Sequence, residues 1–433
     1  MKPSNPIQTA EDQLDSQQQH ASLRPWASLR YRDYSLLFLA SLFVTTAQQM
    51  RQTQNFYQVY ELSGSAFQLG LTGLAQGIPL FVVGLFGGTL ADFVDRRKLL
   101  LLTIAGNFLV AAGLGFLTTT GAIRVWHVLV GTALTSGLNI ILNPTRMALI
   151  SRFVPRSHLT NAVSLNSSVS QSAHFIGPML AGLSLAWMST GYAYLFNALF
   201  YAPAAAGIFL LKIPEMPQRL RENFSMRSFL GGFRFLWRQP VVMTLVLLDF
   251  TIVGVGYYRP LLPIFAKEIL NVGPAGFGAL SSAPAVGGML GTLLLLCIGD
   301  IEHKGLLALW SFLSYAVGLG LFALSGNFWV SLLLLGVLGL ANSLQAVMRQ
   351  TSFHLLTPDH LRGRAFAVFN MFSQGANSVG ATEVGFLAAL IGSPGSLLFG
   401  CAVGGILTLS CWAALPGLRK FGSEKTRRAA ISL

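Results

Sequence analysis

The sequence predicts an all-α membrane protein with twelve transmembrane helices in two bundles of six. Three observations support this fold class. Hydrophobic residues occupy 53% of the 433 positions and charged residues only 10%, whereas about 25% of the residues in soluble domains are charged. Apolar segments of about 20 residues, the length that crosses a bilayer, recur along nearly the whole chain. A polar pattern in the first half also returns in the second.

The expected spans follow one another with short connections. They cover residues 35–58, 66–90, 98–118, 126–150, 161–187 and 191–211, and then 240–263, 274–298, 305–325, 328–350, 364–390 and 395–416. These spans divide the chain into a polar N-terminal tail (1–33), a first bundle (34–211), a central loop (212–239), a second bundle (240–416) and a basic tail (417–433).

The basic residues indicate the orientation. With a cytoplasmic N-terminus, all but four of the 29 Lys and Arg lie on cytoplasmic segments or helix ends, the exceptions being Arg51, Arg124, Arg259 and Lys267. An excess of Lys and Arg on the cytoplasmic side is the positive-inside pattern, so we expect both termini in the cytoplasm. This placement also accounts for the net charge of +13 without a nucleic-acid partner. The tail has no apolar core, so no cleavable signal peptide is expected.

The two halves share a polar register. Residues 144–155 align with 347–358 at a constant shift, which places Arg146 on Arg349 and also aligns Asn139 with Asn342. Duplicated bundles are typical of secondary transporters whose halves rock around a central site.

The connection after the second span reads GGTLADFVDRRK over residues 87–98. Glycines such as Gly88 allow close helix contact in a membrane, and an acid at the membrane boundary needs a positive partner. Asp92 is therefore a candidate for a cytoplasmic latch that closes and opens, with Arg96, Arg97 and Arg146 nearby.

This connection resembles the signature loop of the major facilitator superfamily, although Phe93 and Asp95 depart from its pattern. The segments 143–150 and 177–182 are similar to the drug:proton antiporter branch, which contains the enterobactin exporter and macrolide efflux proteins. The resemblance implies a proton-coupled exporter of a small amphipathic molecule, siderophore or drug-like, that works by alternating access in the bacterial inner membrane. It also implies that Asp92 lies beside the start of helix eleven when the cytoplasmic side is closed.

Two other functions remain open: a nutrient uptake symporter of the same fold, and a membrane sensor or scaffold that transports nothing. Gly177, Pro178 and Gly182 in the fifth span resemble an antiporter motif. Glycine and proline can bend a membrane helix and permit close packing, so this kink either moves during transport or is only structural.

Three titratable residues inside the spans are candidates for proton coupling: Asp249, Glu383 and His174. Asp249 lies nine residues after Pro240, about 14 Å along a helix and near the middle of a hydrocarbon layer roughly 30 Å thick. Desolvation there disfavours the ionised carboxylate, so Asp249 could bind and release a proton, form a structural ion pair or contact substrate. Glu383, Arg51 and Arg259 either form an outer gate or reach the outer interface separately.

A polar helix face predicts the substrate cavity. In the first span, polar residues recur at intervals of three or four, which places them on one side of the helix that is too polar to face lipid. The predicted cavity residues are Thr45, Gln48, Arg51, Gln52, Asn55, Asn139 and Asn342. Hydrogen bonds between helices are the alternative role for each of them.

No motif indicates an enzyme. The chain contains no nucleotide-binding Gly-x-x-x-x-Gly-Lys-Ser/Thr run and no His-Glu-x-x-His or Gly-x-Ser-x-Gly run. Cys297, Cys401 and Cys411 lie in predicted spans without metal-site spacing. We therefore expect no metal and no cofactor, and a monomer in the lipid bilayer whose partners are protons and a small-molecule substrate.

Overall fold

The computed structural model describes residues 26–93, 95–211, 239–299, 303–357 and 359–414, together with Arg234 and Trp237. Most of the two expected tails and of the central loop lies outside these residues. The helices of the first half are α2 (Arg32–Ser63), α3 (Ala66–Phe93), α4 (Arg96–Thr119), α5 (Val125–Phe153), α6 (Leu159–Trp187), α7 (Thr190–Leu199) and α8 (Tyr201–Phe209). Two short turns accompany them, η1 (Ala27–Arg30) and η2 (Arg156–His158).

The second half repeats this series. Its long helices are α10 (Pro240–Val255), α12 (Gly273–Ile298), α13 (Lys304–Leu324), α14 (Phe328–Leu356), α15 (Asp359–Ile391) and α16 (Ser393–Ala414). Between α10 and α12 lie the short elements η3 (Arg259–Leu261), α11 (Leu262–Ile264) and η4 (Phe265–Ile269). With α7 and α8 taken as one interrupted span, the described residues form twelve spans, which confirms the predicted fold class.

Two spans differ from the prediction. The seventh was expected to reach residue 263, but α10 ends at Val255, and Pro260 and Pro263 lie in the short turns that follow. The sixth span is interrupted at Phe200. Proline lacks a backbone N–H, so Pro203 cannot donate to the carbonyl of Leu199, where α7 ends.

Eight of the described spans are long and apolar enough to cross a membrane by length and composition alone. The long helices α2, α6 and α15 are not among them, because each carries a series of Gln, Asn, Ser or Thr residues. Lipid would not accept these side chains on its side of a helix, so they must face protein or water.

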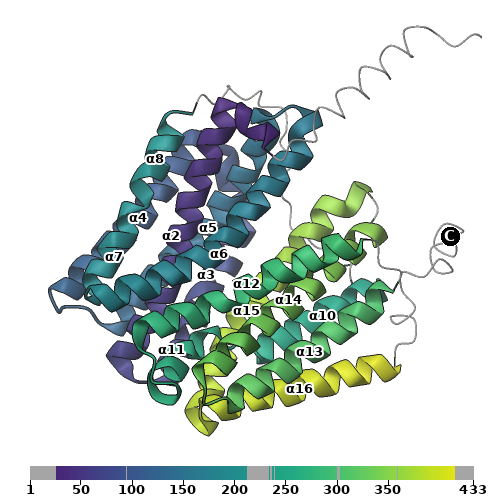
Figure 1. The fold of residues 1–433 in the computed structure, drawn as a ribbon. Helices are drawn as coiled ribbons and strands as arrows, with labels where there is room; N and C mark the ends of the chain where they lie inside the picture. Colours follow the sequence, from purple (N-terminus) through teal and green to yellow (C-terminus); the bar gives the residue numbers. More distant parts are fainter. Residues whose placement is uncertain are drawn as a thin grey trace, which may run out of the picture.

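Each half pairs its helices in the same way. In the first half α2 packs on α6, α3 on α5, and α4 on α7; in the second, α10 packs on α15, α12 on α14, and α13 on α16. The halves meet through α3 with α15 and α6 with α12. Figure 1 shows the two groups of helices joined near α11 and spreading apart toward their other ends.

Glycines make the junction between the halves tight. A Cβ on Gly385 would lie 2.3 Å from the Cα of Gly70, and one on Gly278 would lie 2.6 Å from the Cα of Gly182. Tyr60 adds a hydrogen bond from its hydroxyl to Glu268 across the same junction. These contacts involve the starts of α3 and α12 and the ends of α2, α6 and α15, so they lie at the end expected to face outside.

Candidate substrate cavity and charge network

A cavity of about 880 Å³ lies between the two halves. Residues of α2, α3, α5 and α6 line it from one side, and residues of α12, α14 and α15 line it from the other. The predicted cavity residues Thr45, Gln48, Arg51, Gln52, Asn55, Asn139 and Asn342 all lie in its wall. Whether they contact a substrate stays a prediction.

The polar face of α2 is held in place by α5. The amide of Gln48 donates to Asn139 Oδ1 at 2.6 Å, and the amide of Asn55 donates to Thr132 Oγ1 at 2.9 Å. The hydroxyl of Tyr194 donates to Asn55 Oδ1 at 2.8 Å. These bonds fix the side chains at the wall. The same residues therefore form hydrogen bonds between helices and line the cavity.

Three arginines line the cavity: Arg51, Arg146 and Arg259. Arg51 Nη1 donates to Asn107 Oδ1 at 2.9 Å and to the Tyr201 hydroxyl at 3.5 Å. Within the described residues, none of the three forms an ion pair with a carboxylate, and no Asp or Glu is among those that line the cavity.

Arg146, which was expected near the latch, lines the cavity. Its Nη1 donates to Thr45 Oγ1 at 3.1 Å, so the C-terminal part of α5 is linked to the middle of α2. Arg97 donates to the carbonyl of Phe209, and Arg96 also has a partner. The surroundings of Gly88 and the side chain of Asp92 are outside the described part of the structure, so the latch stays a prediction.

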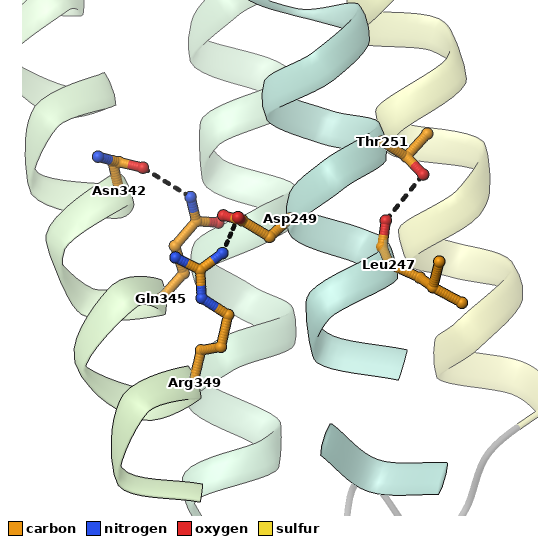
Figure 2. A network of polar contacts seen from close by, with 6 residues as sticks. All are labelled: Leu247, Asp249, Thr251, Asn342, Gln345 and Arg349. Atoms are coloured by element: carbon orange, nitrogen blue, oxygen red, sulfur yellow. Dashed lines mark hydrogen bonds and ion pairs between the residues drawn. The ribbon is translucent and has the colours of Figure 1, made fainter. Parts of the chain in front are cut away.

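Asp249 is paired with a base that the sequence analysis had not assigned to it. Its carboxylate forms an ion pair with Arg349 Nη1, and both side chains are almost fully buried. Figure 2 shows this pair beside Gln345, whose amide donates to Asn342 Oδ1 at 2.9 Å. Asp249 is outside the cavity wall, whereas Asn342 lies in it, and α14 carries Asn342, Gln345 and Arg349 on successive turns.

The internal repeat relates Arg349 to Arg146. Arg349 on α14 is the counterpart of Arg146 on α5, and α10 is the counterpart of α2. Each arginine therefore links the same two helices within its own half. In the first half the acceptor is the hydroxyl of Thr45, and in the second it is the carboxylate of Asp249.

The other two coupling candidates have different surroundings. His174 lines the cavity, with Nδ1 2.7 Å from the carbonyl of Ser170. Glu383 lies on α15 outside the wall, and its buried Oε2 has no hydrogen-bond partner among the described residues.

The three charges proposed for an outer gate do not meet in this structure. Arg51 is held inside the first half, Arg259 lies among Tyr257, Tyr258 and Tyr315, and neither pairs with Glu383. The alternative, that each of them reaches the outer interface separately, stays a prediction. Tyr60 and Glu268 instead make a polar contact across the end expected to face outside.

The fifth-span motif contributes packing. The helix α6 continues through Pro178, and a Cβ on Gly177 would lie 2.6 Å from the Cβ of Gln49 on α2. Gly182 forms the contact with Gly278 described above. Both glycines therefore allow close helix crossings, whether or not the segment moves.

Comparison with known proteins places the chain among transporters. The family model for the transmembrane secretion effectors matches residues 23–426. The chain belongs to this family of the major facilitator superfamily. It is 28% identical over 377 residues to the enterobactin exporter EntS of Shigella boydii and to that of Escherichia coli, which covers 84% of this chain and 87% of each relative.

Solved structures agree on the fold. The nucleoside transporter NupG, as its D323A mutant, superposes with a TM-score of 0.71 at 13% identity, covering 89% of this chain and 100% of that one. A bacterial homologue of the human lysosomal transporter Spinster, in an inward-facing conformation, gives 0.65 at 14% identity, covering 90% and 97%. The protein is thus a multi-pass membrane transporter and not an enzyme.

Proposed function

We propose that this protein exports a small amphipathic molecule, such as a siderophore, across the bacterial inner membrane in exchange for protons. It would work as a monomer, with both termini in the cytoplasm. The observation that carries this proposal is the polar cavity between two halves that are joined tightly at one end. Relatives described as enterobactin exporters support the direction of transport.

Alternating access requires that the two halves separate at one end while they close at the other. The glycine contacts between α3 and α15 and between α6 and α12 close the end expected outside. A hydrophobic cluster with members from both halves, among them Tyr60, Leu69, Phe265 and Phe277, packs at the same end, so these side chains would have to separate when that end opens. The segment 87–98 would then close the cytoplasmic end through Asp92.

Asp249 is our preferred proton carrier. Protonation would neutralise its carboxylate and leave the buried Arg349 without a counter-charge, which is costly in a low-dielectric interior. Gln345 lies one turn before Arg349 on α14 and bonds Asn342 in the cavity wall. A proton on Asp249 would therefore change the forces on the helix that also carries the cavity wall.

Inside-out proteoliposomes with an acidic lumen test the proposal, with enterobactin as the probe. An antiporter would accumulate the probe in the lumen, and a protonophore would abolish the accumulation. A symporter would instead drive the probe out of preloaded vesicles. Movement in neither direction would contradict transport of this substrate, and a negative result across siderophores and drugs would favour the sensor or scaffold.

The same vesicles identify the coupling residue. We expect Asp249→Asn to abolish gradient-driven accumulation, because the amide keeps the size of the side chain but cannot titrate. If accumulation persists at several pH values, the role passes to His174, which lines the cavity, or to Glu383.

A further inference from the structure

We infer that the cavity is built to bind an organic anion, held between Arg51 and Arg146 on one side and Arg259 on the other. This inference rests on the proposed transport function and adds the chemical class of the substrate. It starts from the charges in the cavity wall, where three arginines face the space and no described wall residue is Asp or Glu.

The partners of the arginines are neutral. Arg51 bonds the amide oxygen of Asn107 and the hydroxyl of Tyr201, and Arg146 bonds the hydroxyl of Thr45. Such acceptors orient a guanidinium but leave its charge uncompensated. An uncompensated cation within a membrane protein is expensive unless water or an anion reaches it.

Arg146 also has free bonding capacity. Its buried Nε has no hydrogen-bond partner among the described residues. A guanidinium presents its donors in a planar fork that matches carboxylates and phosphates. Because this Nε is buried, an anionic group in the cavity would accept from the terminal Nη atoms of Arg146, beside or in place of the bond to Thr45.

Arg146 and Arg51 are held at different heights along α2. Thr45, which holds Arg146, lies six residues before Arg51 on α2, or about 9 Å along the helix axis. Arg259 belongs to the other half, so a single anion that contacts all three arginines could draw the two halves together. A volume of about 880 Å³ is within the range of small-molecule sites, about 300–1,000 Å³.

The wall beside Arg259 is aromatic. Tyr257, Tyr258 and Tyr315 line the cavity around this arginine, and Phe56 lines it from α2. Aromatic rings offer apolar surface together with hydroxyl groups. The complementary ligand is thus an aromatic or partly apolar body that carries at least one negative group.

Arg349 provides the internal contrast. It is the repeat counterpart of Arg146, but it lies outside the cavity wall and is paired with Asp249. The second half thus supplies a counter-charge for Arg349, whereas Arg146 in the first half lines the cavity without one among the described residues. The asymmetry is expected if the substrate provides the missing negative charge.

Two dyes with the same xanthene skeleton test the charge preference. Fluorescein is an aromatic anion at pH 8, and rhodamine 6G is a cation. Binding of each to the purified full-length chain in detergent can be followed by fluorescence polarisation. We expect fluorescein to bind at least about tenfold more tightly than rhodamine 6G.

Charge-removing variants then locate the site. Arg51→Gln, Arg146→Gln and Arg259→Gln should each weaken fluorescein binding by roughly tenfold or more, as expected when a hydrogen bond to a charged group is lost. Arg51→Lys should retain part of the affinity. Arg152→Gln is the matched control, because Arg152 is exposed near the end of α5, the helix that carries Arg146.

Equal or tighter binding of rhodamine 6G, or fluorescein affinity that survives all three Gln variants, would overturn the inference. Export of neutral or cationic compounds that is unaffected by these variants would overturn it too, while leaving the transport function intact. If fluorescein binds as expected but the vesicle assay shows no transport of any tested compound, the transport function fails and the anion site stands.

Discussion

The buried pair of Asp249 and Arg349 makes a quantitative prediction. The side chains are 7% and 12% exposed, respectively. Two unit charges about 4 Å apart attract with about 4 kcal/mol at an effective dielectric constant of about 20. Removing one partner of a buried pair costs about 3–5 kcal/mol, because the other charge stays buried alone. We therefore expect Asp249→Asn and Arg349→Gln each to lower the free energy of unfolding by about 3 kcal/mol.

The double variant Asp249→Asn/Arg349→Gln should recover a large part of the summed loss, since it buries no uncompensated charge. Unfolding of the purified chain in detergent micelles gives the four free energies of a double-mutant cycle. Arg152→Gln controls for the removal of an arginine outside the pair. The vesicle assay adds a second readout, in which the double variant should fold but transport without dependence on the proton gradient.

Two results would refute this reasoning. Losses that add within about 0.5 kcal/mol would mean that the two residues are not energetically coupled. A double variant that keeps gradient-driven transport would mean that the pair is structural and that another group carries the proton.

Three further predictions concern the two ends of the molecule. Asp92→Asn should leave membrane insertion intact but slow transport, which initial rates in vesicles will measure; a normal rate would exclude the latch. Gly385→Leu should hold the outer end open, because even a Cβ would lie 2.3 Å from the neighbouring helix backbone. In a chain whose native cysteines are replaced by Ser, an impermeant maleimide applied from outside should then label Gln52→Cys faster. An unchanged labelling rate would contradict outer closure by this contact. Tyr60→Phe should also speed the labelling, by roughly tenfold or more for a lost hydrogen bond to a charged group, and Glu268→Gln should match it. No change in labelling for either variant would show that their bond does not hold the end shut.

The two halves use one architecture for different purposes. The same helix pairings occur in both, yet the arginine of α5 bonds a hydroxyl and that of α14 bonds a carboxylate. In our proposal the first half supplies cationic wall positions for the substrate, and the second half supplies the titratable pair. Duplication thus preserves the packing, while a few polar positions divide the chemistry between the halves.

The sequence by itself determined the twelve spans, the repeat and the polar wall of α2. Bilayer thickness sets the length of a span, and the helical period sets which residues share a face; both are local properties. The residues predicted for the cavity accordingly lie in its wall. The repeat also identified Arg349 as the counterpart of Arg146 in the second half.

Only the tertiary structure decided which charges meet. Asp249 pairs with Arg349, Arg146 lies in the cavity wall, and Arg51, Arg259 and Glu383 remain apart. One turn of uncertainty in depth is about 5.4 Å along a helix, which exceeds the length of an ion pair, and rotation of a helix about its axis is not encoded in any one span. Charge pairing between helices therefore depends on the packing of the whole bundle.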